Sequence, residues 1–330
     1  MKTNLFRIAV LLTACVFNLS ANAQRPIVTL QNGDQMSVFY GAGAFIQAMD
    51  AAERGDVITL AGGSYNAVDI TKAVTIQGAG YVSDPTQLRY RTVINGDFSI
   101  KVEGEEGLSI DGIWHGGTIS VDEDITQATF SKCRLSTLVF EATNTNVTID
   151  RCRIYNLTSD AHCENLYVKN SILHGIGGHD TEDLIAVDNC NIYEARQSVT
   201  ALFQNCIIRE SHMSANSSVF NTAYYGGYSL KTSSVAGNYR LDWNYSDGFN
   251  ASFTEGANTA FDRWDTASFT LSEYAVENYL GADGTQVGIY GGAQPFTDVP
   301  SNPQIVKKEI AKQTDENGKL KVEITVEAQP

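Results

Sequence analysis

The nine residues TIDRCRIYN, from Thr148 to Asn156, alternate between polar and apolar side chains as a β-strand does, except around the cysteine. Counting the residue before them, the apolar or small side chains are Val147, Ile149, Cys152 and Ile154. The step from Ile149 to Cys152 is three residues instead of two. Two short strands that face one interior and meet at a two-residue corner produce this pattern. The stretch therefore predicts a bent pair of strands with Cys152 pointing inward at the corner.

This unit recurs along the chain. Five segments align: ATFSKCRL (128–135), VTIDRCRI (147–154), LYVKNSIL (166–173), IAVDNCNI (185–192) and ALFQNCII (201–208). Their sixth residues are Cys133, Cys152, Ser171, Cys190 and Cys206, at intervals of 19, 19, 19 and 16 residues. Towards the N-terminus, the place of Ile149 is assigned to Ile110, Ile76 and Leu60. Repeated coils of this length stack strand on strand, which predicts an all-β fold, a single-stranded right-handed parallel β-helix.

The corner of each unit predicts two ladders of stacked side chains. The inward position needs a small side chain, and cysteine and serine both fit. We expect Cys152 to be a buried free thiol, while the short distance between turns leaves two disulfides open, Cys133–Cys152 and Cys190–Cys206. At the preceding position we expect a ladder of amides that hydrogen-bond between turns, formed by Asn170, Asn189 and Asn205.

The two ends of the stack require protection. Residues 43–56, GAFIQAMDAAERGD, place apolar side chains on one helical face and predict an N-terminal capping helix. Residues 220–296 are rich in aromatic side chains and are interpreted as irregular late turns followed by a covering segment. Residues 298–330 predict two strands around an Asn-Gly turn, either packed on the solenoid or projecting as a tail. The expected domains are thus a leader (1–23), the capped β-helix (24–297) and a C-terminal hairpin (298–330).

The first residues resemble an export signal. Two basic residues precede the apolar run IAVLLTACVF, and SANA ends in small residues, so cleavage is expected after Ala23. The alternative is a lipoprotein with Cys15 lipidated. No other segment is apolar and long enough to span a bilayer. We therefore expect an exported protein that is periplasmic, on the cell surface or extracellular.

The chain is strongly acidic. Its formal net charge is -15, and removal of residues 1–23 leaves 21 Lys and Arg against 38 Asp and Glu, or -17. Such a charge disfavours nucleic acid, whose binding relies on neutralised phosphates. Neutral glycans, cations and proteins stay open as partners.

The span from residue 45 through the repeats resembles the pectin-lyase-like right-handed β-helix superfamily. The opening FIQAMDAAERGDVITLAGGSYNAVDITKAVTIQGAG (45–80) is most similar to the chondroitinase-B and alginate-lyase type. The segment GTQVGIYGGAQPF (284–296) is similar to uncharacterised secreted β-helix proteins of Bacteroidetes. The resemblance implies the fold but no single activity, because enzymes and non-enzymes share this opening segment. The Gly-His-Gly, Arg-x-Lys, Asn-Lys-Ser and Arg-His-Gly segments of the family's enzymes do not occur in this sequence.

One local cluster combines histidines with acids. In HGIGGHDTED (174–183), the residues His174, His179 and Asp180 could bind a metal or transfer protons, whereas the glycines equally fit a solvated loop. The acidic segment VDEDIT (121–126) offers oxygen ligands for calcium but lacks the spacing of a calcium loop. No metal site is predicted, and calcium is the one cofactor left open.

Two further sets of residues are candidates. The basic cluster on the repeats could attract a carboxylated sugar or supply a base, with an ion-paired wall as the alternative; it comprises Lys132, Arg134, Arg151, Arg153 and Lys169. Trp243, Tyr245 and Trp264 could stack on sugar rings, with core packing as the alternative.

Three functions follow from these features. The first is a non-catalytic exported protein that binds a polysaccharide or a cell-surface protein on the solenoid wall. The second is a polysaccharide lyase or glycoside hydrolase with an unfamiliar site, and the third is a structural spacer.

Overall fold

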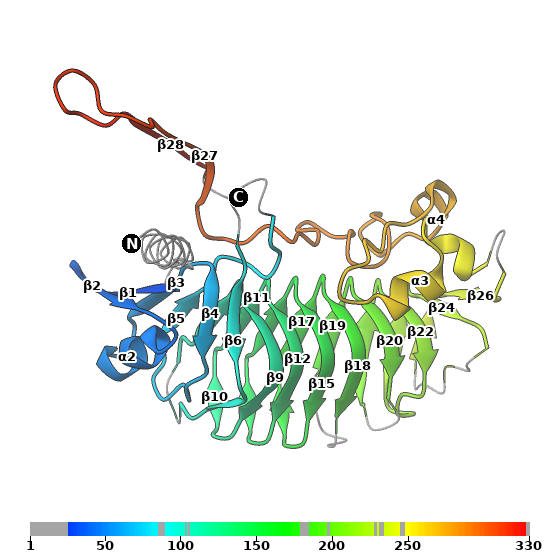
Figure 1. Ribbon diagram of the computed structural model, residues 1–330. Helices are drawn as coiled ribbons and strands as arrows, with labels where there is room; N and C mark the ends of the chain where they lie inside the picture. Colours follow the sequence, from blue (N-terminus) through cyan, green and yellow to red (C-terminus); the bar gives the residue numbers. More distant parts are fainter. Residues whose placement is uncertain are drawn as a thin grey trace, which may run out of the picture.

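The computed structural model describes residues 26–84, 90–102, 104, 106–178, 185–196, 199–227, 230, 234–244 and 248–327. The chain is nearly all β and forms a parallel β-solenoid of about 9 turns (Figure 1). The predicted β-helix is confirmed. The leader, including Cys15 and Ala23, lies outside the described residues, as do His179, Asp180 and Tyr245.

Three sheets form the walls of the solenoid. The first has the order β2 (Gln35–Tyr40), β1 (Ile27–Asn32), β3 (Val57–Leu60), β5 (Thr75–Gln77), β8 (Ser109–Asp111), β11 (Thr129–Ser131), β14 (Thr148–Asp150), β17 (Leu166–Lys169), β19 (Ile185–Asp188), β21 (Ala201–Gln204), β23 (Ser218–Phe220) and β25 (Ser234–Ala236). The second has the order β26 (Tyr239–Leu241), β24 (Ala223–Tyr225), β22 (Ile207–Ser211), β20 (Asn191–Ala195), β18 (Ile172–Gly178), β15 (Arg153–Ser159), β12 (Arg134–Phe140), β9 (Trp114–Val121), β6 (Thr92–Asn95) and β4 (Gly63–Asn66), with β7 (Phe98–Ile100) beside β9. The third, a short sheet, comprises β10 (Ile125–Thr126), β13 (Asn144–Thr145) and β16 (Cys163–Glu164).

The strand register agrees with the sequence alignment at the repeats. Ile149 pairs with Phe130 on one side and with Val168 on the other. At the N-terminal end, however, Ile58 and not Leu60 pairs with Ile76, so the assignment of Leu60 is wrong. Both side chains are fully buried and lie two residues apart on one face, so burial alone does not distinguish them. Beyond residue 210 the solenoid continues for two more turns, through Val219 and Val235.

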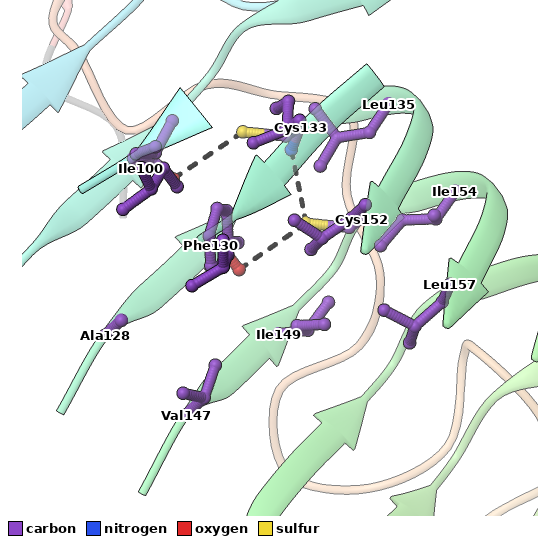
Figure 2. Packing of buried hydrophobic residues seen from close by; sticks show 14 of the residues in the cluster. Ile100, Ala128, Phe130, Cys133, Leu135, Val147, Ile149, Cys152, Ile154 and Leu157 are labelled. Carbon is purple, nitrogen blue, oxygen red and sulfur yellow. Dashed lines mark hydrogen bonds between the residues drawn. The ribbon is translucent and has the colours of Figure 1, made fainter. Parts of the chain in front are cut away.

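The inward corner position carries hydrogen bonds as well as packing. The backbone N–H of Cys133 donates to Sγ of Cys152 at 3.5 Å (Figure 2). That of Cys152 donates to Oγ of Ser171 at 3.0 Å. All described cysteines are buried free thiols. Burial raises the pKa of the Cys133 and Cys190 thiols well above the usual value, so these thiols stay protonated and are poor nucleophiles.

The residue before each of these positions has a left-handed backbone. The φ angles are 47° at Lys132, 52° at Arg151, 44° at Asn170, 51° at Asn189 and 53° at Asn205. Asparagine tolerates this conformation better than most residues, which explains its recurrence. The amides of Asn170 and Asn205 bond to other groups and not to each other, and Oδ1 of Asn189 is buried without a partner. Nδ2 of Asn170 donates to the carbonyl oxygens of Ile289 and Gly291, at 3.1 and 2.8 Å.

The N-terminal end is covered by more than a helix. Helix α2 (Ala44–Ala51) buries Ala44, Phe45, Ala48 and Met49, as its sequence predicts. Strands β1 and β2 add an antiparallel hairpin that continues the first sheet. Its two-residue turn is Gly33-Asp34, with a φ of 55° at the glycine. This hairpin was missed from the sequence, although Gly-Asp between alternating apolar residues is a hairpin signal.

After the last turn the chain runs back along the solenoid. The 3-10 helix η2 (Asn250–Ser252) and the helices α3 (Ala257–Asp262) and α4 (Glu273–Asn278) are followed by extended chain that returns towards the N-terminal end (Figure 1). Residues 257–302 are termed the strap. Near its end, Nδ2 of Asn302 donates to the carbonyl oxygen of Gly78 at 2.8 Å.

The chain ends in the predicted antiparallel hairpin, β27 (Gln304–Ile310) and β28 (Val322–Glu327). Figure 1 shows it projecting from the solenoid, so of the two alternatives the projecting one is correct. Among the described residues, no helix is both long and apolar enough to cross a membrane.

The left-handed corners are testable at Asn189. We expect Asn189→Val to lower the free energy of unfolding by about 1–2 kcal/mol, because a β-branched side chain is strained at positive φ. Asn189→Gly removes the same amide without this strain and should be much closer to the wild type. Chemical denaturation monitored by circular dichroism measures both. Equal losses in the two variants would contradict the explanation.

Candidate functional site

A row of stacked rings lies on the outer face of the second sheet. Tyr155, His174 and Tyr193 each follow an inward residue by one position, and they are 19 residues apart, one turn each. The rings of Tyr155 and His174 stack with centroids 4.2 Å apart, and those of His174 and Tyr193 with centroids 4.4 Å apart. The repeat itself therefore builds the row, since identical positions on successive turns meet face to face.

The row stops at Tyr155. On the two preceding turns the same position is taken by Ser136 and, before it, by Gly116, neither of which has a ring. A cavity of about 360 Å³ opens there. We call it the aromatic slot, and define it by Trp114, Gly116, Arg134, Ser136, Tyr155 and Trp264. One face of Tyr155 is thus covered by His174, and its ring borders the slot.

The strap supplies the other wall of the slot. The ring of Trp264 lies 5.5 Å from that of Tyr155 and 6.4 Å from that of His174. The carbonyl oxygens of Trp264 and Ala267 accept hydrogen bonds from the Arg153 guanidinium, at 2.9 and 3.0 Å. Arg153 is only 3% exposed and also pairs with Asp298 at 3.5 Å. This buried arginine therefore fixes the strap, and with it Trp264, against the solenoid.

Arginine and tryptophan alternate at the N-terminal side of the slot. The Arg134 guanidinium lies 5.4 Å from the Trp114 ring and 5.8 Å from the Trp264 ring, and Arg91 lies 4.9 Å from Trp114. Arg134 pairs with Asp265 of the strap at 2.6 Å. Burial lowers the pKa of Arg134, Asp265 opposes this, and Arg91 adds to it. An arginine stays charged under these conditions, so the slot has a cationic rim.

The imidazole of His174 is a packing group in this arrangement. Both of its faces are covered by tyrosines. Burial lowers its pKa, and Arg196 lowers it further, so the ring is neutral at pH 7. His115, one turn before Leu135, also borders the cavity, and its Nε2–H donates to the carbonyl oxygen of Gly96, 2.8 Å away.

The other predicted site residues lie elsewhere. Lys132 is almost fully buried at the corner, and burial, aided by Arg151, lowers its pKa. Arg151 pairs with Asp150 at 2.6 Å. Trp243 packs on Tyr225 and Phe249, with centroids 5.0 and 6.0 Å away, in an aromatic cluster near the last turns. None of these three residues lines the slot, so among the aromatic candidates that are described only Trp264 does.

The acidic segment proposed for calcium is engaged in local bonds. Asp122 accepts from Ser120, and Asp124 accepts from the backbone N–H of Thr143 at 3.0 Å. In the described part of the chain, no group of three or more histidines, cysteines and acids is arranged to hold a metal.

Two residues of the slot were missed from sequence. Tyr155 and Trp114 were not singled out as ligands, whereas Arg134 and Trp264 were among the candidates. The 19-residue spacing of Tyr155, His174 and Tyr193 was readable from the alignment and would have predicted the stacked row. The contribution of the strap was not readable, because it joins residues more than 100 positions apart. The slot can hold a flat or ring-shaped group by stacking and offers donors at its rim.

Comparison with known proteins gives no match, neither to a family model, nor to a curated protein, nor to a solved structure.

The role of Arg153 is testable by proteolysis. We expect Arg153→Met to leave the carbonyl oxygens of Trp264 and Ala267 unpaired, at a cost of roughly 1–3 kcal/mol for each buried group. The strap should then open more often, and limited proteolysis within residues 257–302 should be at least about tenfold faster. Arg151→Met is the matched control, because Arg151 pairs with its neighbour Asp150 and not with the strap. Equal cleavage rates in both variants would contradict the anchoring role.

The neutral state of His174 is testable by pH. The pKa of His174 in the folded chain is lowered from 6.5. Between the folded and unfolded pKa values, the imidazole is protonated in the unfolded chain and neutral in the folded chain. Stability should therefore fall as the pH falls from about 7 towards the folded-state pKa, and level off below it. NMR titration of the imidazole and denaturation across this range measure the effect. His174→Phe should make the pH dependence shallower, leaving the contribution of His115, whose pKa burial also lowers. An unchanged pH dependence in this variant would count against the assignment.

Proposed function

We propose that the protein binds carbohydrate, without cleaving it, by stacking a sugar ring on Tyr155 in the aromatic slot. The observation that carries the proposal is the interrupted row of rings. Tyr155 is 43% exposed, and Ser136 leaves open the place on the next turn where a ring would continue the stack. One turn further, the ring of Trp114 lies over Gly116. Turns are spaced by about 4.8 Å, so one ring fits between Tyr155 and the turn of Trp114.

The chemistry of the lining supports a sugar over a purely apolar ligand. Sugar rings offer one or two apolar C–H faces and an equator of hydroxyl groups. Tyr155 and Trp264 provide aromatic surfaces for the faces. The guanidinium group of Arg134, which lines the slot, provides donors for the hydroxyl or carboxylate oxygens. A cavity of about 360 Å³ is at the small end of ligand sites, which favours a short stretch of a glycan.

The arrangement favours binding over acid–base cleavage. Hydrolysis of a glycosidic bond usually needs two carboxyl groups facing each other across the bond. Asp265, the acid nearest the slot by its contact with Arg134, is held in an ion pair at 2.6 Å. His174, the histidine of the row, has both ring faces covered. Because Asp265 and His174 are engaged in these contacts, the described lining residues offer aromatic surfaces for stacking and hydrogen-bond donors.

The setting of this activity is also a proposal. We infer that the protein is a distant member of the pectin-lyase-like superfamily, similar to secreted proteins of Bacteroidetes. It is exported with cleavage after Ala23, and acts in the periplasm, on the cell surface or outside the cell. Its partner is a polysaccharide, free or carried by a cell-surface protein.

The test is a glycan-array screen followed by titration of the best oligosaccharide. We expect Tyr155→Ala and Trp264→Ala each to weaken binding by about tenfold or more, equivalent to about 1.4 kcal/mol. Tyr167→Ala is the matched control, since Tyr167 is similarly exposed, at 36%, but lies on the first sheet. Its affinity should equal that of the wild type.

Two results would contradict the proposal. A blank array would remove its basis, and equal losses in all three variants would place binding outside the slot. Unsaturated or reducing ends released from the bound glycan would instead indicate a lyase or a hydrolase.

A further inference from the structure

The C-terminal hairpin exposes one apolar face. Directly opposed residues of an antiparallel pair point to the same side. Ile305 is opposite Val326, Ile310 is opposite Val322, and Lys308 is opposite Ile324. The five apolar side chains of this set are 42–57% exposed. The opposite face is polar and holds an ion pair between Lys307 and Glu323 at 2.7 Å.

The hairpin is held together by its own contacts. Within the described part of the chain, the hydrogen bonds and ion pairs that involve β27 and β28 join residues of the hairpin only. A lone two-stranded hairpin is marginally stable in water, and gains stability when its apolar face packs on another surface. The hairpin therefore has the properties of an element that is completed by a partner.

A second unpartnered apolar face lies at the same end of the solenoid. Strand β2 is the terminal strand of the first sheet, with one edge unpaired in the described structure. Its side chains Met36, Val38 and Tyr40 alternate onto one face and are 70%, 43% and 60% exposed. Figure 1 shows the hairpin directed away from the solenoid at this N-terminal end.

We propose that the protein forms a two-fold dimer in which the apolar face of each β27–β28 hairpin covers the β2 face of the other copy. The contact is reciprocal, as a two-fold axis requires, and it covers both apolar faces of both copies. It is independent of the glycan site, since no residue of the aromatic slot takes part.

The charge of Lys308 favours this contact over a simpler dimer in which the two hairpins pack on each other. If two hairpins packed face to face, the Lys308 side chains in the middle of each apolar face would be brought together and desolvated, which is unfavourable. Against β2 this conflict is absent. The turn before β2 carries the exposed carboxylate of Asp34, which provides a counter-charge for Lys308.

The buried area agrees with a stable dimer. Each copy contributes five apolar side chains from the hairpin and three from β2. A half-exposed side chain of this size gives up roughly 50 Å² of apolar surface, so the dimer would bury about 800 Å² of it. Apolar atoms form roughly 60% of an interface, which makes the whole contact about 1,300 Å². Specific interfaces bury about 1,200–2,000 Å².

The mass of the purified protein in solution tests the proposal. Sedimentation at protein concentrations from about 1 to 100 µM should show a dimer. The dissociation constant of the dimer should lie in this range or below it. Ile324→Glu and Val38→Glu should each shift the protein to the monomer. Thr325→Glu places the same charge one residue away on the polar face, opposite Lys307, and should stay dimeric. Because the hairpin and the outer face of β2 lie outside the core, the melting temperature of the solenoid should change little.

A cross-linking experiment identifies the contact. Val38→Cys and Ile324→Cys are introduced into separate copies, the first of which carries a size tag, and the two proteins are mixed and oxidised. The described native cysteines are fully buried and do not compete. A disulfide that joins the tagged Val38→Cys variant to the untagged Ile324→Cys variant supports the dimer. A monomer at all concentrations, a dimer unaffected by Ile324→Glu, or disulfides only between copies of the same variant would overturn it.

Discussion

The hydrogen bonds from inward corner N–H groups to a sulfur or oxygen atom of the next turn are the constraint on which this solenoid depends; the donors are Cys133, Cys152, Ser171 and Cys206. Each of these residues follows a left-handed corner residue, and its N–H points into an apolar interior. A buried N–H without an acceptor is costly. Cysteine and serine satisfy it within the space that a tight turn leaves. The same position therefore sets the register between turns and limits the interior to small side chains.

The outer wall follows from this register. Once turns of 19 residues are locked together, equal positions stack, and the rings of Tyr155, His174 and Tyr193 meet face to face. Asn170 and Asn205 of the left-handed corners then take a second role, because their amides bind the returning strap. Arg153 completes this attachment. The slot thus exists where a regular wall, interrupted by Ser136 and Gly116, faces an irregular strap.

The sequence determined the repeat well and the site poorly, for physical reasons. The spacing of the cysteine positions is a local property of the chain, and it predicted the strands, their pairing and the parallel stack. Leu60 was misplaced because two buried residues on one face satisfy the same pattern. Tyr155 could have been found from its spacing. Trp264 was only one of several aromatic candidates, since its neighbours come from contacts across more than 100 residues. Lys132 looked available for chemistry because exposure is not encoded in residue type.

The returning strap links the last part of the chain to the first. Residue 302 contacts Gly78, and Trp264 faces a pocket whose other wall is formed by residues 114–155. During synthesis the turns can stack one after another behind the emerging chain, but the pocket has only one wall until the strap has been made. The site is therefore completed only after the solenoid turns that form its first wall, and a chain truncated after the final turn would lack the slot.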